Sequence, residues 1–173
     1  AGATGGLGAV LGAIVSPGDE VLILAPFWPL VAGIVRSFRG SPKAVPVFGN
    51  VDGVELLLEQ LEQAVSKRTV AIYVNSPNNP SGLLMPRDWM EAIAEWARSK
   101  DLWILSDEVY DLYVYEGKHV YMYALAPERT FSSFSFSKAY GMAGNRCGFM
   151  IGPETVMKHA QKISTHSFYS TPT

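Results

Sequence analysis

The sequence predicts an α/β fold, with a mostly parallel central sheet covered by helices on both faces in a three-layer arrangement. Short apolar runs recur along the chain, which is typical of parallel strands buried on both sides. Helical segments alternate with these runs, as the crossovers between parallel strands require. The chain has 173 residues, of which 48% are hydrophobic, and this is enough for the core of one ordinary domain.

The expected elements follow one another in a regular order. A glycine-rich helix runs from near the start of the chain to about Val15, where Ser16-Pro17-Gly18-Asp19 ends it. Alternating leucines and glutamates predict an amphipathic helix over residues 54–65, and Pro86 suits the first turn of the next helix. Further helices are expected at residues 30–38 and 153–163, and strands at residues 21–25, 44–48, 69–74, 102–106, 130–134 and 147–152.

Composition excludes several classes of function. A net charge of −2 with scattered basic residues gives no field for nucleic acid. The apolar run from Leu7 to Val15 is too short for a membrane span, so we expect a buried helix there. The three histidines lie too far apart in the sequence for a metal motif, and no metal site is expected. The single cysteine, Cys147, rules out an intrachain disulfide and suits a reducing compartment, so we expect a cytoplasmic protein.

Two early stretches carry polar or aromatic groups next to expected element ends. The glycine-rich entry to the first helix, with Thr4, leaves backbone N–H groups bare at a positive helix end, which favours a phosphate cradle. Tight helix packing through small residues explains the same glycines. Trp28 follows the strand at residues 21–25 and could stack on a flat ring there, or fill the core under the next helix.

Two later stretches follow buried strands in the same way. The run Asn75-Ser76-Pro77-Asn78-Asn79-Pro80-Ser81-Gly82 builds a rigid turn whose amides can donate to an oxygen in front of the sheet, although a plain turn remains the alternative. Asp107 ends the strand at residues 102–106 and could hold a protonated ring nitrogen, with Tyr110 bonding a phenolic oxygen on the same ring. A helix N-cap is the alternative for Asp107.

The lysine segment Ser135-Phe136-Ser137-Lys138 comes directly after the strand at residues 130–134, and Arg146 stands eight positions further on. A lysine at the end of a buried strand is out of place unless it is paired or covalently engaged. Schiff-base chemistry with an aldehyde cofactor is one such use, and it needs an anion site, an acid facing a ring nitrogen and an aromatic face. The stretches described above offer all three.

Taken together, these stretches resemble the large domain of class I/II aminotransferases, the fold-type I enzymes that use pyridoxal 5′-phosphate. The resemblance covers nearly the whole chain, and it rests on modest motifs that occur in the right order and spacing. They are Gly2-Ala3-Thr4-Gly5-Gly6-Leu7, Pro26-Phe27-Trp28, the asparagine run from Asn75 to Gly82, Asp107-Glu108-Val109-Tyr110, and Ser135-Phe136-Ser137-Lys138 with Arg146 and Gly148.

The resemblance implies catalytic roles for Lys138, Asp107 and Tyr110. Lys138 would form the internal aldimine with the cofactor and later move the proton between Cα and C4′. Asp107 would pair with the pyridinium nitrogen and keep the ring an electron sink. Tyr110, with Asn79, would bond the phenolic oxygen of the ring.

The same resemblance implies how the cofactor is held. Trp28 would stack on the ring face. The phosphate would be bound at the start of the first helix and by the lysine segment, with Arg146 as a charge-assisted partner. The residues implied at the phosphate are Ala3, Thr4, Ser135 and Arg146.

Departures from the family pattern are small within the chain. Ser81 stands where threonine is frequent, and Cys147 stands where an aliphatic residue is usual. The family's amino-terminal arm would precede residue 1, and its small domain, with the arginine that clamps the substrate carboxylate, would follow residue 173. We therefore expect residues 1–173 to be a partial cofactor-binding large domain, and the family implies a homodimer.

The expected function is that of an aminotransferase acting on an amino acid and a 2-oxo acid. A carbon–sulfur β-lyase shares these motifs and is one alternative. A non-catalytic fragment that binds the cofactor or forms a dimer is another.

Overall fold

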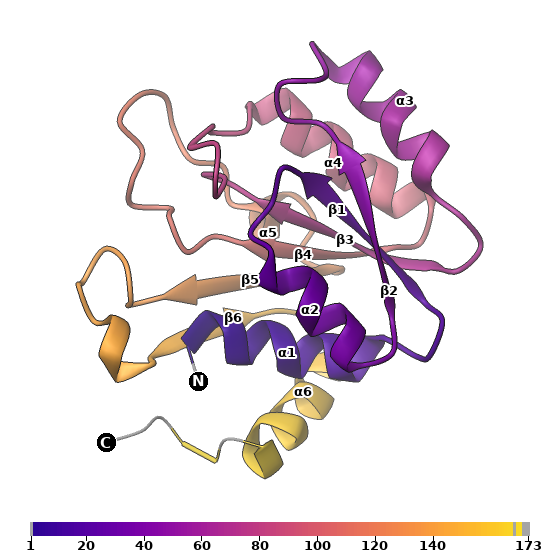
Figure 1. The fold of residues 1–173 in the computed structure, drawn as a ribbon. Helices are drawn as coiled ribbons and strands as arrows, with labels where there is room; N and C mark the ends of the chain where they lie inside the picture. Colours follow the sequence, from indigo (N-terminus) through magenta and orange to yellow (C-terminus); the bar gives the residue numbers. More distant parts are fainter. Residues whose placement is uncertain (1, 168, 171–173) are drawn as a thin grey trace.

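The computed structural model describes residues 2–167 and 169–170, and these form one central sheet between two layers of helices (Figure 1). The strand order is β2-β1-β3-β4-β5-β6. Neighbouring strands are parallel except that β6 runs antiparallel to β5, so the predicted mostly parallel sheet is confirmed. The strands are β1 (Glu20–Ala25), β2 (Ser41–Pro46), β3 (Thr69–Asn75), β4 (Trp103–Asp107), β5 (Thr130–Ser135) and β6 (Gly148–Ile151).

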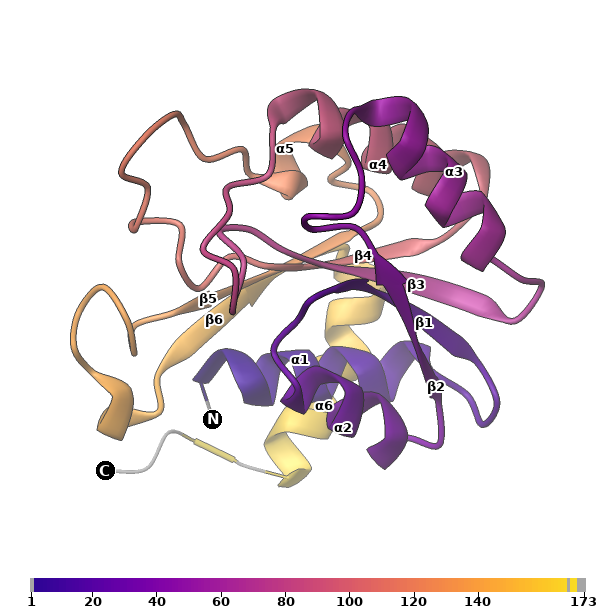
Figure 2. The ribbon, with the colours of Figure 1, turned by 45° about the horizontal axis from the view of Figure 1, so that its top comes forward.

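Helices cover both faces of this sheet, as the three-layer prediction required (Figure 2). Helices α1, α2 and α6 lie on one face, and α3, α4 and α5 lie on the other. A separate cluster of buried apolar side chains fills the space under each layer. The helices are α1 (Gly2–Ile14), α2 (Leu30–Ser37), α3 (Val54–Ala64), α4 (Arg87–Ser99), α5 (Met122–Leu125) and α6 (Glu154–Ser167).

Helix α1 packs closely because its glycines lack side chains. A Cβ atom at Gly6 would lie 2.5 Å from Sδ of Met150, and one at Gly12 would lie 2.7 Å from Phe38. Leu7 and Leu11 are fully buried on the same helix. The packing explanation of the glycine-rich stretch therefore holds for Gly6 and Gly12, while the start of the helix remains free for another use.

Strand β2 differs from its predicted bounds of residues 44–48. It begins at Ser41, which pairs with Glu20, and it ends at Pro46. Because β2 lies at the edge of the sheet, Pro42 can occupy it without breaking a ladder between two neighbours. Val47 and Phe48 instead turn away, and both of their N–H groups donate to the carbonyl oxygen of Ala25.

Two short elements were not predicted, namely α5 and a 3₁₀ turn at Ala143–Asn145. Each is only about one turn long, so neither leaves a clear apolar period in the sequence. Within the described residues, no helix combines the length and the apolar character needed to cross a membrane.

Gly148 joins the start of α1 to the β5–β6 edge, and we predict that Gly148→Ala destabilises the chain. The new Cβ would lie 2.5 Å from the carbonyl oxygen of Phe134 and 2.9 Å from the backbone nitrogen of Ala3, and backbone atoms cannot easily move aside. We expect a loss of about 1–3 kcal/mol in the free energy of unfolding, measured by denaturant titration.

The matched control is Gly33→Ala in α2, where the new Cβ would meet nothing within 4 Å. Alanine is the better helix former, so this variant should gain up to about 1 kcal/mol. Equal effects of the two substitutions would contradict this account of Gly148.

Candidate active site

The carboxyl ends of β1, β3, β4 and β5 meet at one edge of the sheet, next to the start of α1, and a pocket of about 310 Å³ lies there. All nine residues singled out from the sequence line this pocket. They are Ala3, Thr4, Trp28, Asn79, Asp107, Tyr110, Ser135, Lys138 and Arg146.

A larger hollow of about 560 Å³ lies on the other side of α1, between β6 and α6. Glycines and apolar side chains make up much of its lining, and none of the nine residues reaches it. Chemistry rather than size therefore identifies the smaller pocket as the candidate active site.

Asp107 is the last residue of β4, and its side chain is buried at the floor of the pocket. Tyr73 donates a hydrogen bond of 2.6 Å from its hydroxyl to Oδ2 of Asp107, and the N–H of Val109 lies 3.4 Å from Oδ1. No helix begins at this point of the described chain, so the helix N-cap explanation of Asp107 is wrong.

Burial raises the pKa of Asp107 from 3.8 to about 6, while the hydrogen bond from Tyr73 acts in the opposite direction. The positive charge of Lys138 also lowers this pKa, so the amine and the acid act on each other across the pocket. Among the described residues, no basic side chain forms an ion pair with Asp107. The site thus contains a desolvated carboxylate that a bound cation would stabilise.

Lys138 lies beyond the end of β5, in the turn that follows the strand, and its side chain is exposed. The chain leaves the sheet at Ser135, so this lysine follows the buried strand without being buried itself. Its Nζ lies 5.4 Å from the centre of the Tyr110 ring. Its backbone carbonyl accepts a hydrogen bond of 3.1 Å from the hydroxyl of Tyr113.

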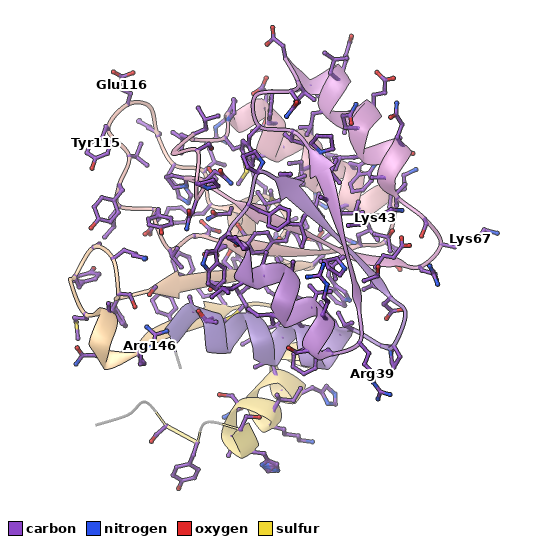
Figure 3. The ribbon with its side chains drawn as sticks, viewed as in Figure 1. Arg39, Lys43, Lys67, Tyr115, Glu116 and Arg146 are labelled. Carbon is purple, nitrogen blue, oxygen red and sulfur yellow. The ribbon has the colours of Figure 1, made fainter. Side chains whose placement is uncertain are left out.

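The pocket also contains groups that could hold an anion. The first turn of α1 contains no acidic residue, so its positive end is not offset. Figure 3 shows Arg146 beside this end, and a Cβ at Gly2 would lie only 3.0 Å from its guanidinium. Arg146 donates to the hydroxyl of Ser137 and to the carbonyl of Ala143. Bare N–H groups and a held guanidinium are the donor set that a phosphate needs.

Trp28 and Asn79 close the pocket from the loops that follow β1 and β3. Trp28 packs against the core under α1, as one of the two explanations offered for it requires, and it also lines the pocket. The side-chain nitrogen of Asn79 lies 3.5 Å from the hydroxyl of Tyr110. The asparagine run is more than a plain turn, because the amide of Asn78 also donates to the carbonyl of Pro26 and so ties the two loops together.

Three further residues belong to this site, although the sequence motifs assign them no role. Tyr73 holds the carboxylate of Asp107, and Asn75 donates to the Asp107 carbonyl while accepting from the N–H of Asn79. Ser137 was quoted within a motif but given no role, and it lines the pocket. Tyr73 and Asn75 could have been identified from their positions in the sequence, because both are polar residues on one face of an otherwise apolar buried strand.

Within the described part of the chain, no three histidine, cysteine, aspartate or glutamate residues gather where they could hold a metal ion. The candidate active site brings together the amine of Lys138, the buried acid of Asp107 and the guanidinium of Arg146.

Comparison with known proteins identifies the family of this chain. The family described as "Aminotransferase class I and II" matches residues 1–173. The chain belongs to this family.

Individual relatives make the likeness more specific. A probable aspartate/prephenate aminotransferase of Thermus aquaticus is 40% identical over 93% of this chain and 42% of its own length. An arginine–pyruvate transaminase of Pseudomonas aeruginosa is 34% identical over 99% of this chain and 44% of its own length. A solved structure of a Thermus thermophilus aspartate aminotransferase double mutant superimposes with a TM-score of 0.92 at 36% identity, covering 98% of this chain and 44% of that one. The chain thus spans less than half the length of these relatives.

The raised pKa of Asp107 predicts how stability depends on pH. A carboxyl group that binds its proton more tightly in the folded than in the unfolded state makes the fold less stable as pH rises through the two pKa values, here 3.8 and about 6. The cofactor-free chain should therefore lose roughly 3 kcal/mol from this group between about pH 4 and pH 7.

The measurement is denaturant unfolding across this range for the wild type and for Asp107→Asn, which can still accept from Tyr73. Glu20, Glu62 and Glu128 have lowered pKa values, so their contributions to the stability of the fold increase as pH rises. These contributions are the same in both proteins and cancel in the comparison. The difference between the two curves should follow Asp107, and parallel curves would contradict the prediction.

Proposed function

We propose that the protein is a pyridoxal 5′-phosphate-dependent aminotransferase, which moves an amino group between an L-amino acid and a 2-oxo acid. One observation carries this proposal, namely that the amine of Lys138 and the buried carboxylate of Asp107 line the same pocket as an anion cradle. Membership of the aminotransferase family supports the class of reaction.

The anion cradle suits the phosphate of this cofactor. Ala3 and Thr4, at the start of α1, would offer N–H groups and a hydroxyl, and Ser135 would add a second hydroxyl. Arg146 would pair with the phosphate charge, since its guanidinium already lies against the first turn of α1. The close approach at Gly2 supports this fit, because a side chain there would crowd the arginine.

The opposite end of the pocket suits the ring. Asp107 lacks a cationic partner among the described residues, and a protonated ring nitrogen would supply one. Asn79 and Tyr110, whose polar atoms lie 3.5 Å apart, would share the phenolic oxygen of the ring. Trp28 would cover the ring face from the loop after β1.

Bound there, pyridoxal phosphate would supply an aldehyde that links to an amine and a cationic ring that draws electrons from the substrate Cα. The side chains of the pocket would orient the cofactor and move the substrate proton. Asp107 would keep the proton on the ring nitrogen, because its carboxylate would be the acceptor for that proton. Lys138 would link to the cofactor through Nζ, and once the substrate amine has displaced it, the freed Nζ would take or return the substrate proton. Tyr73 keeps the Asp107 carboxylate oriented, since burial and the charge of Asp107 raise the pKa of Tyr73 well above its ordinary value and it remains a donor.

The remaining parts of the proposal come from the family. The substrates would be an amino acid and a 2-oxo acid, and the relatives described above are named for different amino acids, so we propose no single one. We also propose that residues 1–173 are part of a cofactor-binding large domain, that the protein forms a homodimer and that it is cytoplasmic. The carbon–sulfur lyase alternative is not favoured, because these relatives are named as aminotransferases or transaminases.

We predict that pyridoxal phosphate added to the purified chain produces an absorbance band of covalently bound cofactor, and that Lys138→Ala abolishes this band. The reason is that Nζ of Lys138 is the only amine lining the pocket within the described residues. Lys162→Ala, an exposed lysine on α6, is the matched control and should keep the band.

The same samples test transfer, measured as 2-oxo acid formed from a panel of amino acids. Lys138→Ala should abolish transfer, and Lys162→Ala should not. A wild-type chain without the band, or a Lys138→Ala chain with an unchanged band, would contradict the proposed function.

A further inference from the structure

A second buried cluster lies directly behind the candidate active site. Glu108 follows Asp107 in the chain, and its side chain is fully buried. Its Oε1 accepts a hydrogen bond of 2.7 Å from the hydroxyl of Ser132, and its Oε2 lies 2.6 Å from Nε2 of His119. The rings of His119 and Tyr121 pack nearly at right angles, with their centres 4.6 Å apart. None of these side chains lines the pocket or has a role in the proposed chemistry.

The Glu108–His119 pair closes the base of a loop. Residues 109–118 leave the end of β4, run out into solvent and return at His119. Figure 3 shows Tyr115 and Glu116 at the outer end of this loop, and Tyr115 is 90% exposed. A loop with so exposed an outer end has little packing of its own to fix its shape.

The inner part of the same loop contacts the lysine segment twice. The centre of the Tyr110 ring lies 5.4 Å from Nζ of Lys138. The hydroxyl of Tyr113 donates a hydrogen bond of 3.1 Å to the backbone carbonyl of Lys138. The position of Lys138 therefore depends on where the loop holds these two tyrosines.

We infer that Glu108 and His119 form a positioning pair, which fixes both ends of loop 109–118 and so holds Tyr110 and Tyr113 against the lysine segment. A buried carboxylate is stable only while its hydrogen-bond donors remain in place. The two ends of the loop therefore cannot separate without leaving the carboxylate of Glu108 buried and without its histidine donor. The N–H of Glu108 also donates to the carbonyl of Ser133 at 2.9 Å, which anchors this end to β5.

A second side-chain contact across the loop is weaker. The hydroxyl of Tyr121 lies 3.2 Å from Oδ2 of Asp111, but Tyr121 is 42% exposed and water competes for this bond. The buried pair is thus the stronger constraint on the loop.

Amide hydrogen exchange of the cofactor-free chain tests the inference. His119→Phe keeps an aromatic ring but removes the donor to Glu108, and exchange in residues 109–118 should become at least tenfold faster. His119→Gln offers an amide donor in place of Nε2 and should restore most of the protection. Leu57→Ala, a core substitution in α3 on a different part of the fold, is the control for general destabilisation. If exchange in residues 109–118 rises no more in His119→Phe than in Leu57→Ala, the inference is overturned.

Binding of pyridoxal phosphate gives a second readout, which rests on the proposed function. Tyr113→Phe should weaken cofactor affinity several-fold in the wild-type background and have little effect in the His119→Phe background, because the loop no longer holds the tyrosine there. Additive effects of the two substitutions would overturn the inference.

The two proposals fail in different ways. A wild-type chain that binds no cofactor would refute the proposed function, and loop exchange would still decide the role of the pair. If His119→Phe does not fold, Ser132→Ala removes the other donor to Glu108 and should also speed exchange in residues 109–118. Unchanged exchange in that variant would likewise overturn the inference.

Discussion

The desolvated carboxylate of Asp107 is the constraint on which the rest of the candidate site depends. It is buried, its pKa is raised to about 6, and its best partner is the neutral hydroxyl of Tyr73 rather than a cation. A lone buried charge is costly, so a site of this kind is more stable when a cationic group occupies the pocket. The charge of Lys138 reaches Asp107 only weakly, because the lysine side chain is exposed at the pocket rim.

The parallel sheet explains why groups so distant in sequence meet at this point. In a parallel sheet the carboxyl ends of the strands share one edge, and the loops that follow them face the same space. Asn75 at the end of β3 and Asp107 at the end of β4 are register partners, and Asp107 is in turn the partner of Ser133 on β5. The start of α1 comes to the same edge because Gly148 lets its backbone approach β6 closely. One edge thus collects the acid, the lysine segment and the anion cradle.

Much of this arrangement could be predicted from the sequence. Buried parallel strands are apolar on both faces, so β1, β3 and β4 were found to within a residue or two, and the polar groups after them indicated the site edge. What could not be predicted depends on tertiary contacts. The start of β2 was missed because proline is tolerated only where a strand lies at a sheet edge, which a local pattern does not reveal. The position of Tyr73 on β3 was a weak signal, but its bond to Asp107 depends on the packing of β3 against β4 and is seen only in the structure. The exposure of Lys138 follows from the turn after β5, which carries no periodic signal.

The most direct test of this account is the titration of Asp107 itself, followed by NMR of the ¹³C-labelled carboxyl group and assigned with Asp107→Asn. In the cofactor-free chain we expect a pKa of about 6, well above the ordinary value of 3.8. Saturation with pyridoxal phosphate should lower this pKa, because a ring cation then faces the carboxylate. A carboxyl group that titrates near its ordinary value, or whose pKa does not fall when the cofactor binds, would contradict the account.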